Sequence, residues 1–253
     1  MIVIKTPREQ ELMRKAGRVV GLVFNEIKDK IRPGLSTLDV ANMCEKVIRD
    51  NKAYPTFLGY GGFKGAVCVS VNDEIVHGIP SNKRILREGD IVSVDVGATL
   101  NGYIGDACRT FIVGVAPESV HRLVEITEQS FFEGVKYAKV GNHLGDISNA
   151  IQTFVEAHGY SIVKEYTGHG VGHELHEDPY IPNYGEKGTG PVLKEGMCLA
   201  IEPMVNEGKA AIRVASDGWT ARTKDGKLSS HYENSILITK DGYEILTMVK
   251  EEN

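Results

Sequence analysis

Acidic side chains stand at matching places in two parts of the chain, and their setting is typical of metal binding. Asp95 lies within the apolar run 91–96, where an unpaired carboxylate would be very costly. Glu202 follows 107 residues later, between Ile201 and Pro203. The stretches around the two acids match at this constant offset. Two buried acids at equivalent positions need a shared cation.

A predicted hairpin brings a second acid beside Asp95. The dipeptide Asn101-Gly102 favours a two-residue turn with positive φ at both positions. In that register Gly97 faces Asp106, so Asp95 and Asp106 are diagonal neighbours on the same side of the sheet. We therefore expect one or two cations to fit between their carboxylates. The alternative is that each aspartate is a solvated position on an amphipathic strand.

Glu233 completes a quartet of acids. The segment 231–239 resembles the strand that carries Asp106, allowing about 20 extra residues in the second part of the chain. The quartet is Asp95, Asp106, Glu202 and Glu233. Oxygen ligands with imidazole suit hard-to-borderline divalent ions such as Mn²⁺, Fe²⁺, Co²⁺ or Zn²⁺. We expect two ions, because four carboxylates around one dication would leave net negative charge buried.

Histidines are concentrated in the glycine-rich segment 167–179. His169, His173 and His176 have the spacing of ligands on one helix face, but the three glycines among them argue against a helix. We instead expect an extended segment in which His169 is a metal ligand and His173 is not. His77 lies between a predicted strand and a Gly/Pro turn and mirrors His176 in the other part. Both are expected to be neutral imidazoles that hydrogen-bond or shuttle protons, although a lone histidine such as His77 is usually structural.

Helices and strands of the expected kinds can position these residues. Helical spacing of apolar residues predicts helices from Leu12 to Val23, from a Thr37 cap to Val47, from Ser119 onward, and from Leu144 to Ala157. Strands are predicted at Ala66–Val71, Asp90–Val96, Met197–Ile201 and Ser235–Thr239. Two runs of helices followed by strands indicate an α+β fold, with helices on one face of a mostly antiparallel sheet. We expect a single domain, 1–253, made of two related halves (about 8–114 and 115–250) with the site between them.

Composition narrows the class of protein. The 253 residues are 42% hydrophobic and 25% charged with a net charge of −5, which is typical of a folded globular protein and gives no basic footprint for nucleic acid. No apolar stretch approaches the roughly 20 residues of a membrane span, and no secretory signal precedes the first charges, so we expect a cytoplasmic protein. The four cysteines form no Cys-x-x-Cys pair and are expected to be buried thiols. A monomer is the expected state.

Other enzyme chemistries have no motif in the sequence. There is no Gly-x-Ser-x-Gly elbow and no phosphate-binding Gly-x-x-x-x-Gly-Lys-Ser/Thr loop. The glycines of the run 59–65 miss the dinucleotide-binding Gly-x-Gly-x-x-Gly pattern because position 64 is Lys64. Serine hydrolase and nucleotide-binding functions are therefore unsupported.

With the acid quartet, the Gly-His-Gly segment and the duplicated halves, the chain resembles the pita-bread metalloaminopeptidases, and among them the type I methionine aminopeptidases in their minimal bacterial form. The resemblance runs from about residue 2 to residue 249. It implies a pita-bread fold with pseudo-twofold halves and a curved antiparallel sheet. It also implies metal-dependent removal of the initiator methionine from nascent polypeptides whose second residue is small.

The resemblance also implies roles for individual residues. The five ligands of two divalent cations would be Asp95, Asp106, His169, Glu202 and Glu233, with Asp106 and Glu233 bridging. Glu202 would also accept the proton of the attacking water, His176 would stabilise the oxyanion, and His77 would contact the peptide nitrogen beyond the cut.

A pocket for an apolar, unbranched side chain and a further ion site are implied as well. The pocket residues would be Tyr60, Phe63, Cys68, Leu175 and Trp219; the alternative is that they are plain core. A monovalent cation, Na⁺ or K⁺, would lie near Asn72, Glu74 and Ser229.

His231 stands where some relatives carry glutamine, which changes the hydrogen bonding that orients ligands. Phe57, Phe63 and Leu175 also differ from other bacterial members, which affects the shape of the pocket.

Two rival functions remain open at this stage. One is an Xaa-Pro-cleaving relative with the same fold, and the other is a catalytically inactive relative that acts as a binding protein. Association with the ribosome would suit an enzyme of nascent chains, but no motif for it is present.

Overall fold

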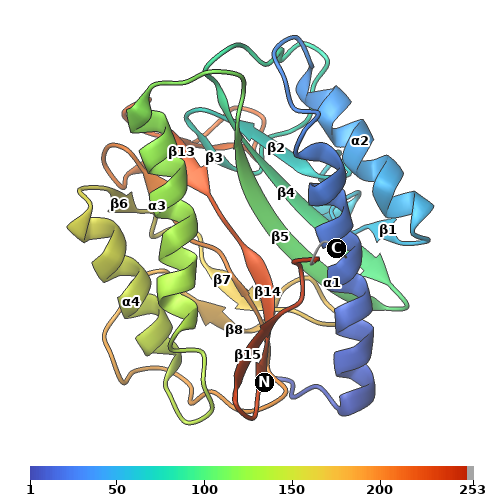
Figure 1. The fold of residues 1–253 in the computed structure, drawn as a ribbon, viewed down its shortest axis with the longest axis vertical. Coiled ribbons are helices and arrows are strands. Elements are labelled where there is room, and N and C mark those ends of the chain that lie inside the picture. Colours follow the sequence, from blue (N-terminus) through green and yellow to red (C-terminus); the bar gives the residue numbers. More distant parts are fainter. Residues whose placement is uncertain (250–253) are drawn as a thin grey trace.

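Helices in two pairs flank the strands of the protein. The structure, a computed structural model, describes residues 1–249; the end of the predicted second half, at about residue 250, lies outside the described residues. The helices are α1 (Pro7–Ile27), α2 (Thr37–Asp50), α3 (Glu118–Val135) and α4 (Leu144–Ala157), with a short 3-10 helix at Tyr60–Gly62. Figure 1 shows α1 and α2 along one side of the strands and α3 and α4 along the other.

Local capping explains where the first two helices begin. Thr6 caps α1 through a capping box with Glu9, in which each side chain bonds the other residue's backbone amide. In α2 the same box is formed by Ser36 and Asp39. The predicted cap at Thr37 is therefore wrong by one residue, because the Ser36 hydroxyl reaches the amide three residues on while Thr37 is already helical. The four predicted helices are otherwise confirmed.

The strands are short, and every pair between them in residues 1–249 is antiparallel. They are β1 (Tyr54–Pro55), β2 (Cys68–Val71), β3 (Glu74–Val76), β4 (Ile91–Leu100), β5 (Tyr103–Ile112), β6 (Ser161–Ile162), β7 (Gly168–Gly170), β8 (Glu177–Ile181), β9 (Cys198–Ile201), β10 (Met204–Asn206), β11 (Ile212–Val214), β12 (Ala221–Thr223), β13 (Ser229–His231), β14 (Asn234–Thr239) and β15 (Gly242–Ile245). Four sheets result, with strand orders β1-β4-β2 plus β5 beside β4, β13-β10-β6, β11-β12-β3 and β15-β14-β9-β7-β8. The α+β class is confirmed, and the predicted strands differ only at their ends.

The β4–β5 hairpin has the predicted register. Asn101 and Gly102 both have positive φ, 52° and 80°, as a two-residue turn of this type requires. Leu100 pairs with Tyr103, and Gly97 pairs with Asp106. The longest strands of the molecule therefore carry Asp95 and Asp106 in a fixed relation.

Helix α1 lies against this hairpin at a contact of two glycines. A Cβ added to Gly105 would lie 2.6 Å from the Cα of Gly17, a distance that real Cβ atoms essentially never show. Only glycine on the strand lets the helix backbone approach so closely. One core cluster joins α1, α2 and β4, and another joins α3, α4, β9 and β14. None of the described helices is both long and apolar enough to cross a membrane.

Candidate metal centre

A seam of hydrogen bonds joins β5 to the chain around β13 and β14, and it brings Asp106 beside Glu233. At its centre the backbones of Cys108 and Glu233 exchange two bonds, of 3.3 and 3.0 Å. At one end the Ser235 hydroxyl accepts from the Asp106 amide and donates to the Asp106 carbonyl. The sequence offered no local signal for this pairing, because the partners are about 125 residues apart.

At the other end of this row of hydrogen bonds, Thr110 binds the backbone of His231. Its hydroxyl accepts from the His231 amide at 3.1 Å and donates to the His231 carbonyl at 2.8 Å. Arg109 also spans the seam, and its guanidinium donates to the carbonyls of Cys108 and Glu233. The backbone beneath the acids is thus held at several points.

His169 reaches the acids from a strand that admits only glycine at its two ends. It lies in β7 between Gly168 and Gly170, where an added Cβ would lie 2.4 and 2.2 Å from the carbonyl oxygens of Ala200 and Asp178. The prediction of an extended segment here is confirmed. Pairing of His169 with Ala200 places the ring near Glu202, which follows β9 directly.

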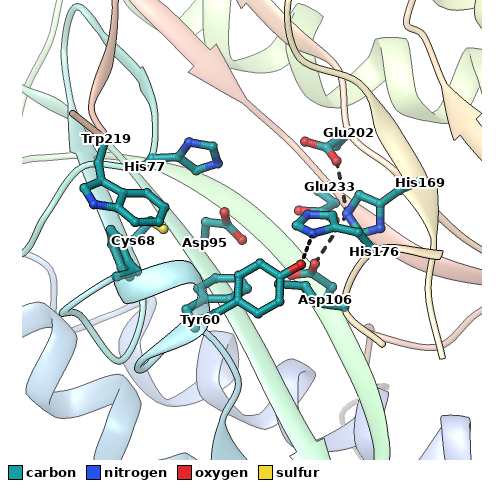
Figure 2. Close-up of a pocket in the computed structure, with 13 residues that line it drawn as sticks. Tyr60, Cys68, His77, Asp95, Asp106, His169, His176, Glu202, Trp219 and Glu233 are labelled. Atoms are coloured by element: carbon teal, nitrogen blue, oxygen red, sulfur yellow. Dashed lines mark hydrogen bonds and ion pairs between the residues drawn. The ribbon is translucent and has the colours of Figure 1, made fainter. Parts of the chain in front are cut away.

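Three ligand-type atoms converge around the His169 ring. Its Nε2 lies 3.7 Å from Asp106 Oδ2 and 3.5 Å from Glu202 Oε1. Atoms of Asp106, His169 and Glu233 lie within 4.8 Å of one another, and these residues are buried. Figure 2 shows them with Glu202 on one side of a pocket, Asp95 in the middle, and His77 with Trp219 across from them.

Burial and mutual repulsion both disfavour the ionised forms of the four acids. Burial raises the pKa of Asp95 to about 7. Burial, and then repulsion from neighbouring carboxylates, raises the pKa values of Asp106, Glu202 and Glu233 well above their usual range. Burial lowers the pKa of His169 to about 4, so its imidazole is neutral at pH 7.

Buried oxygens without hydrogen-bond partners show that the site fits a cation. In residues 1–249, Asp95 Oδ1, Asp106 Oδ1 and Glu233 Oε1 are shielded from solvent and accept no hydrogen bond. Unpaired carboxylate oxygens would be strongly destabilising in this setting. Divalent cations would pair with these oxygens and with the neutral imidazole of His169, a donor set suited to hard-to-borderline metals.

A cavity of about 130 Å³ opens beside the acids. It is lined by the acid quartet with His77, His169 and His176 and by the five predicted pocket residues, together with Phe57. The Tyr60 hydroxyl bonds His176 Nδ1 at 2.7 Å, and the rings of Phe63 and Trp219 meet edge to face at 5.2 Å. Phe57, expected to affect the shape of the pocket, is thus one of the residues that line it.

An unusual backbone conformation sets the direction of the His77 side chain. Its φ is 61°, in the left-handed region that few residues other than glycine adopt. Its ring stands edge to face with Tyr166 at 5.3 Å and with Trp219 at 6.4 Å. Such a conformation persists only where the surroundings hold it, which is typical of functional sites. His173, by contrast, is exposed and bonds the Gly102 carbonyl instead.

The residues predicted near a monovalent cation also come together. The Ser229 amide donates to the Asn72 carbonyl at 2.9 Å. The Glu74 carboxylate accepts from the Val71 amide and pairs with Arg222. The ion itself stays a prediction. The four cysteines are buried and free, as predicted.

Comparison with known proteins identifies the family of this site. Residues 11–240 match the model of metallopeptidase family M24. The chain belongs to metallopeptidase family M24. The M24 chain is 51% identical to methionine aminopeptidase 1 of Bacillus subtilis, over 98% of this chain and 100% of that one. The predicted resemblance to type I methionine aminopeptidases is thereby confirmed.

Solved structures support the pita-bread fold of the M24 chain. Methionine aminopeptidase from Thermotoga maritima superposes with a TM-score of 0.97 at 50% identity, over 98% of this chain and 100% of that one. Prolidase from Pyrococcus furiosus has a TM-score of 0.78 at 26% identity, over 98% of this chain and 66% of that one. The fold alone therefore does not separate the two activities, whereas the full-length similarity favours the first.

Proposed function

We propose that this M24 chain is a metal-dependent aminopeptidase that releases the N-terminal methionine of nascent polypeptides. The observation that carries the proposal is the group of buried, unpartnered carboxylate oxygens of Asp95, Asp106 and Glu233, at the wall of a cavity that is partly lined by apolar side chains. Full-length similarity to methionine aminopeptidases supports the choice of substrate.

The metal-holding residues we propose are those of the cluster. They would be Asp95, Asp106, His169, Glu202 and Glu233, which together offer ligands for two divalent ions. Bound Co²⁺, Mn²⁺, Fe²⁺ or Zn²⁺ would lower the pKa of a water molecule and polarise the scissile carbonyl.

The chain's own residues would then move protons and hold the substrate. Glu202 would accept a proton from the attacking water. His176 lies at the cavity wall, where a donated hydrogen bond would stabilise the developing oxyanion. Because burial lowers the pKa of His176, the ring is neutral, and its Nδ1 is engaged by Tyr60. His77 faces the same cavity from the opposite side, where it would contact the peptide nitrogen beyond the cut.

The side chain of methionine suits the apolar part of the cavity. Phe63, Cys68, Leu175 and Trp219 belong to one hydrophobic cluster and also line the cavity, so the core and pocket interpretations are compatible. A flexible thioether fills an irregular apolar space of this kind well. The setting we propose is the cytoplasm, near emerging chains at the ribosome.

The test is hydrolysis of the peptides Met-Ala-Ser and Ala-Pro-Ala by chelator-stripped protein supplied with each of the four metals. We expect metal-dependent release of methionine from the first peptide only. Glu202→Ala should abolish the release, whereas Glu195→Ala, a change on the exposed surface, should leave it unchanged.

Either other result identifies a rival function. Cleavage of the proline peptide alone would assign the Xaa-Pro activity. Absence of turnover with every metal would leave the binding-protein hypothesis.

A further inference from the structure

His231 places an imidazole nitrogen beside two of the acids. It is the last residue of β13, is only 1% exposed, and is fixed at its backbone by both hydrogen bonds to Thr110. Its Nε2 lies 3.6 Å from Glu202 Oε2 and 4.0 Å from Glu233 Oε2. Glu202 thus presents one oxygen to His169 and the other to His231.

The Nε2 atom has no hydrogen-bond partner in the described chain. It is buried and unpartnered, as is Oε1 of the neighbouring Glu233. Both distances to the acids exceed the 3.2 Å or so of an ordinary N–H···O bond. Two ligands that share one ion at about 2.1 Å each lie roughly 3–4 Å apart. The spacing therefore matches ligands around a cation better than a hydrogen-bonded pair.

We propose that His231 is a further nitrogen ligand of the metal centre, which joins Glu202 and Glu233 at one of its ions. This rests on the proposed metal-dependent function and extends its ligand set by one residue. Ligand-type atoms of these three residues lie within 4.8 Å of one another, as do those of Asp106, His169 and Glu233. Each of the two groups contains one imidazole, and Glu233 belongs to both.

A second imidazole changes which metals the centre prefers. Imidazole suits Zn²⁺ and Fe²⁺, whereas carboxylate and water suit Mn²⁺. As a neutral ligand, it also adds no charge to a site that already holds four acids. The centre should therefore bind Zn²⁺ more tightly than Mn²⁺, and the difference in affinity should depend on His231.

X-ray absorption of the full chain loaded with two equivalents of Zn²⁺ tests the ligand directly. We expect the spectrum to show imidazole ligands from two histidines for two zinc ions, which is an average of one imidazole per ion. His231→Gln should halve the imidazole contribution. His121→Gln, which removes an exposed histidine on α3, should leave it unchanged. An average of one imidazole for two ions in the wild type would overturn the proposal and leave His231 as a hydrogen-bond partner of Glu202.

Calorimetric titration adds a second measurement. His231→Gln should weaken Zn²⁺ binding about tenfold and Mn²⁺ binding clearly less. An equal effect on both metals would contradict a nitrogen ligand and indicate a structural role. If the variant does not fold, the wild-type absorption spectrum still decides. Failure of the wild type to bind either metal would overturn the proposed function as well, whereas binding through a single imidazole overturns only this inference.

Discussion

Asp106 and Ser235 hold each other by two hydrogen bonds through one hydroxyl group. The Asp106 amide donates to Ser235 Oγ at 3.0 Å, and that hydroxyl donates to the Asp106 carbonyl at 2.8 Å. Ser235 is fully buried and lies on β14, two residues beyond Glu233. This side chain is therefore one of the contacts that fix the strand segment carrying Asp106 relative to the segment carrying Glu233.

Replacing Ser235 with alanine should destabilise the fold. Loss of the hydroxyl leaves a buried amide and carbonyl of Asp106 without this partner, which costs about 1–3 kcal/mol in the free energy of unfolding. Urea denaturation of the metal-free protein measures the difference. Ser230→Ala is the matched control, because Ser230 Oγ is buried without a partner among the described residues and its removal should cost nothing. Equal stabilities of the two variants would contradict the role of Ser235.

Arg109 should contribute to stability and to metal binding through the same seam. Its guanidinium donates to the carbonyls of Cys108 and Glu233 and to Asn234 Oδ1. It also lies over the ring of Tyr232 at 4.3 Å. Arg109→Met should lower the free energy of unfolding by about 2–3 kcal/mol, because it removes several bonds from a charged donor. It should also weaken divalent metal binding, because the Glu233 carbonyl loses one of the hydrogen bonds that hold the backbone of this acid.

The matched variants for Arg109 separate its geometry from its charge. Arg109→Lys keeps the charge but cannot reproduce the fork of donors, so its stability should lie between those of wild type and Arg109→Met. Arg122→Met, an exposed change on α3, should have no effect. Full stability of the lysine variant in urea denaturation would show that charge alone matters.

The sequence predicts those features of this site whose signals lie within a few adjacent residues. Asn101-Gly102 encodes its own turn, so the pairing of Gly97 with Asp106 follows from a few adjacent residues. The glycines around His169 forbid a helix in the same local way. No such local signal identifies Ser235 or Arg109. Their partners come from distant segments, and the sequence does not distinguish them from other serines and arginines. The direction of His231 likewise depends on Thr110, more than a hundred residues away.

Glu9 should make the free energy of unfolding depend on pH within a defined range. Hydrogen bonds from the side chain and then the backbone of Thr6 lower the pKa of Glu9 to about 2, from an ordinary value of 4.5. A folded-state pKa below the unfolded one gives stability that is present above about pH 4.5 and is lost as the pH falls towards 2.

The variant Glu9→Gln isolates this contribution from those of the other acids. At pH 7 it should be less stable than wild type by about 1 kcal/mol, the usual size of a helix-cap effect. The difference should shrink steadily between pH 4.5 and pH 2. Denaturant unfolding of both proteins at several pH values measures it, and a difference that does not change with pH would exclude Glu9 as the source.

Tyr60 should support catalysis by fixing His176 rather than by binding substrate alone. Burial raises the pKa of Tyr60, so its phenol is protonated at neutral pH and can donate to His176 Nδ1. An accepting Nδ1 leaves the proton on Nε2, which is the form that can donate to an oxyanion. Tyr60→Phe keeps the apolar ring at the cavity wall but removes this donor. We expect kcat for Met-Ala-Ser to fall about fivefold, the effect of one ordinary hydrogen bond, with little change in KM. Tyr54→Phe is the control, because in residues 1–249 that exposed hydroxyl donates to the Leu58 carbonyl and to no group of the cavity. A rise in KM with unchanged kcat would instead mean that Tyr60 acts only in holding the substrate.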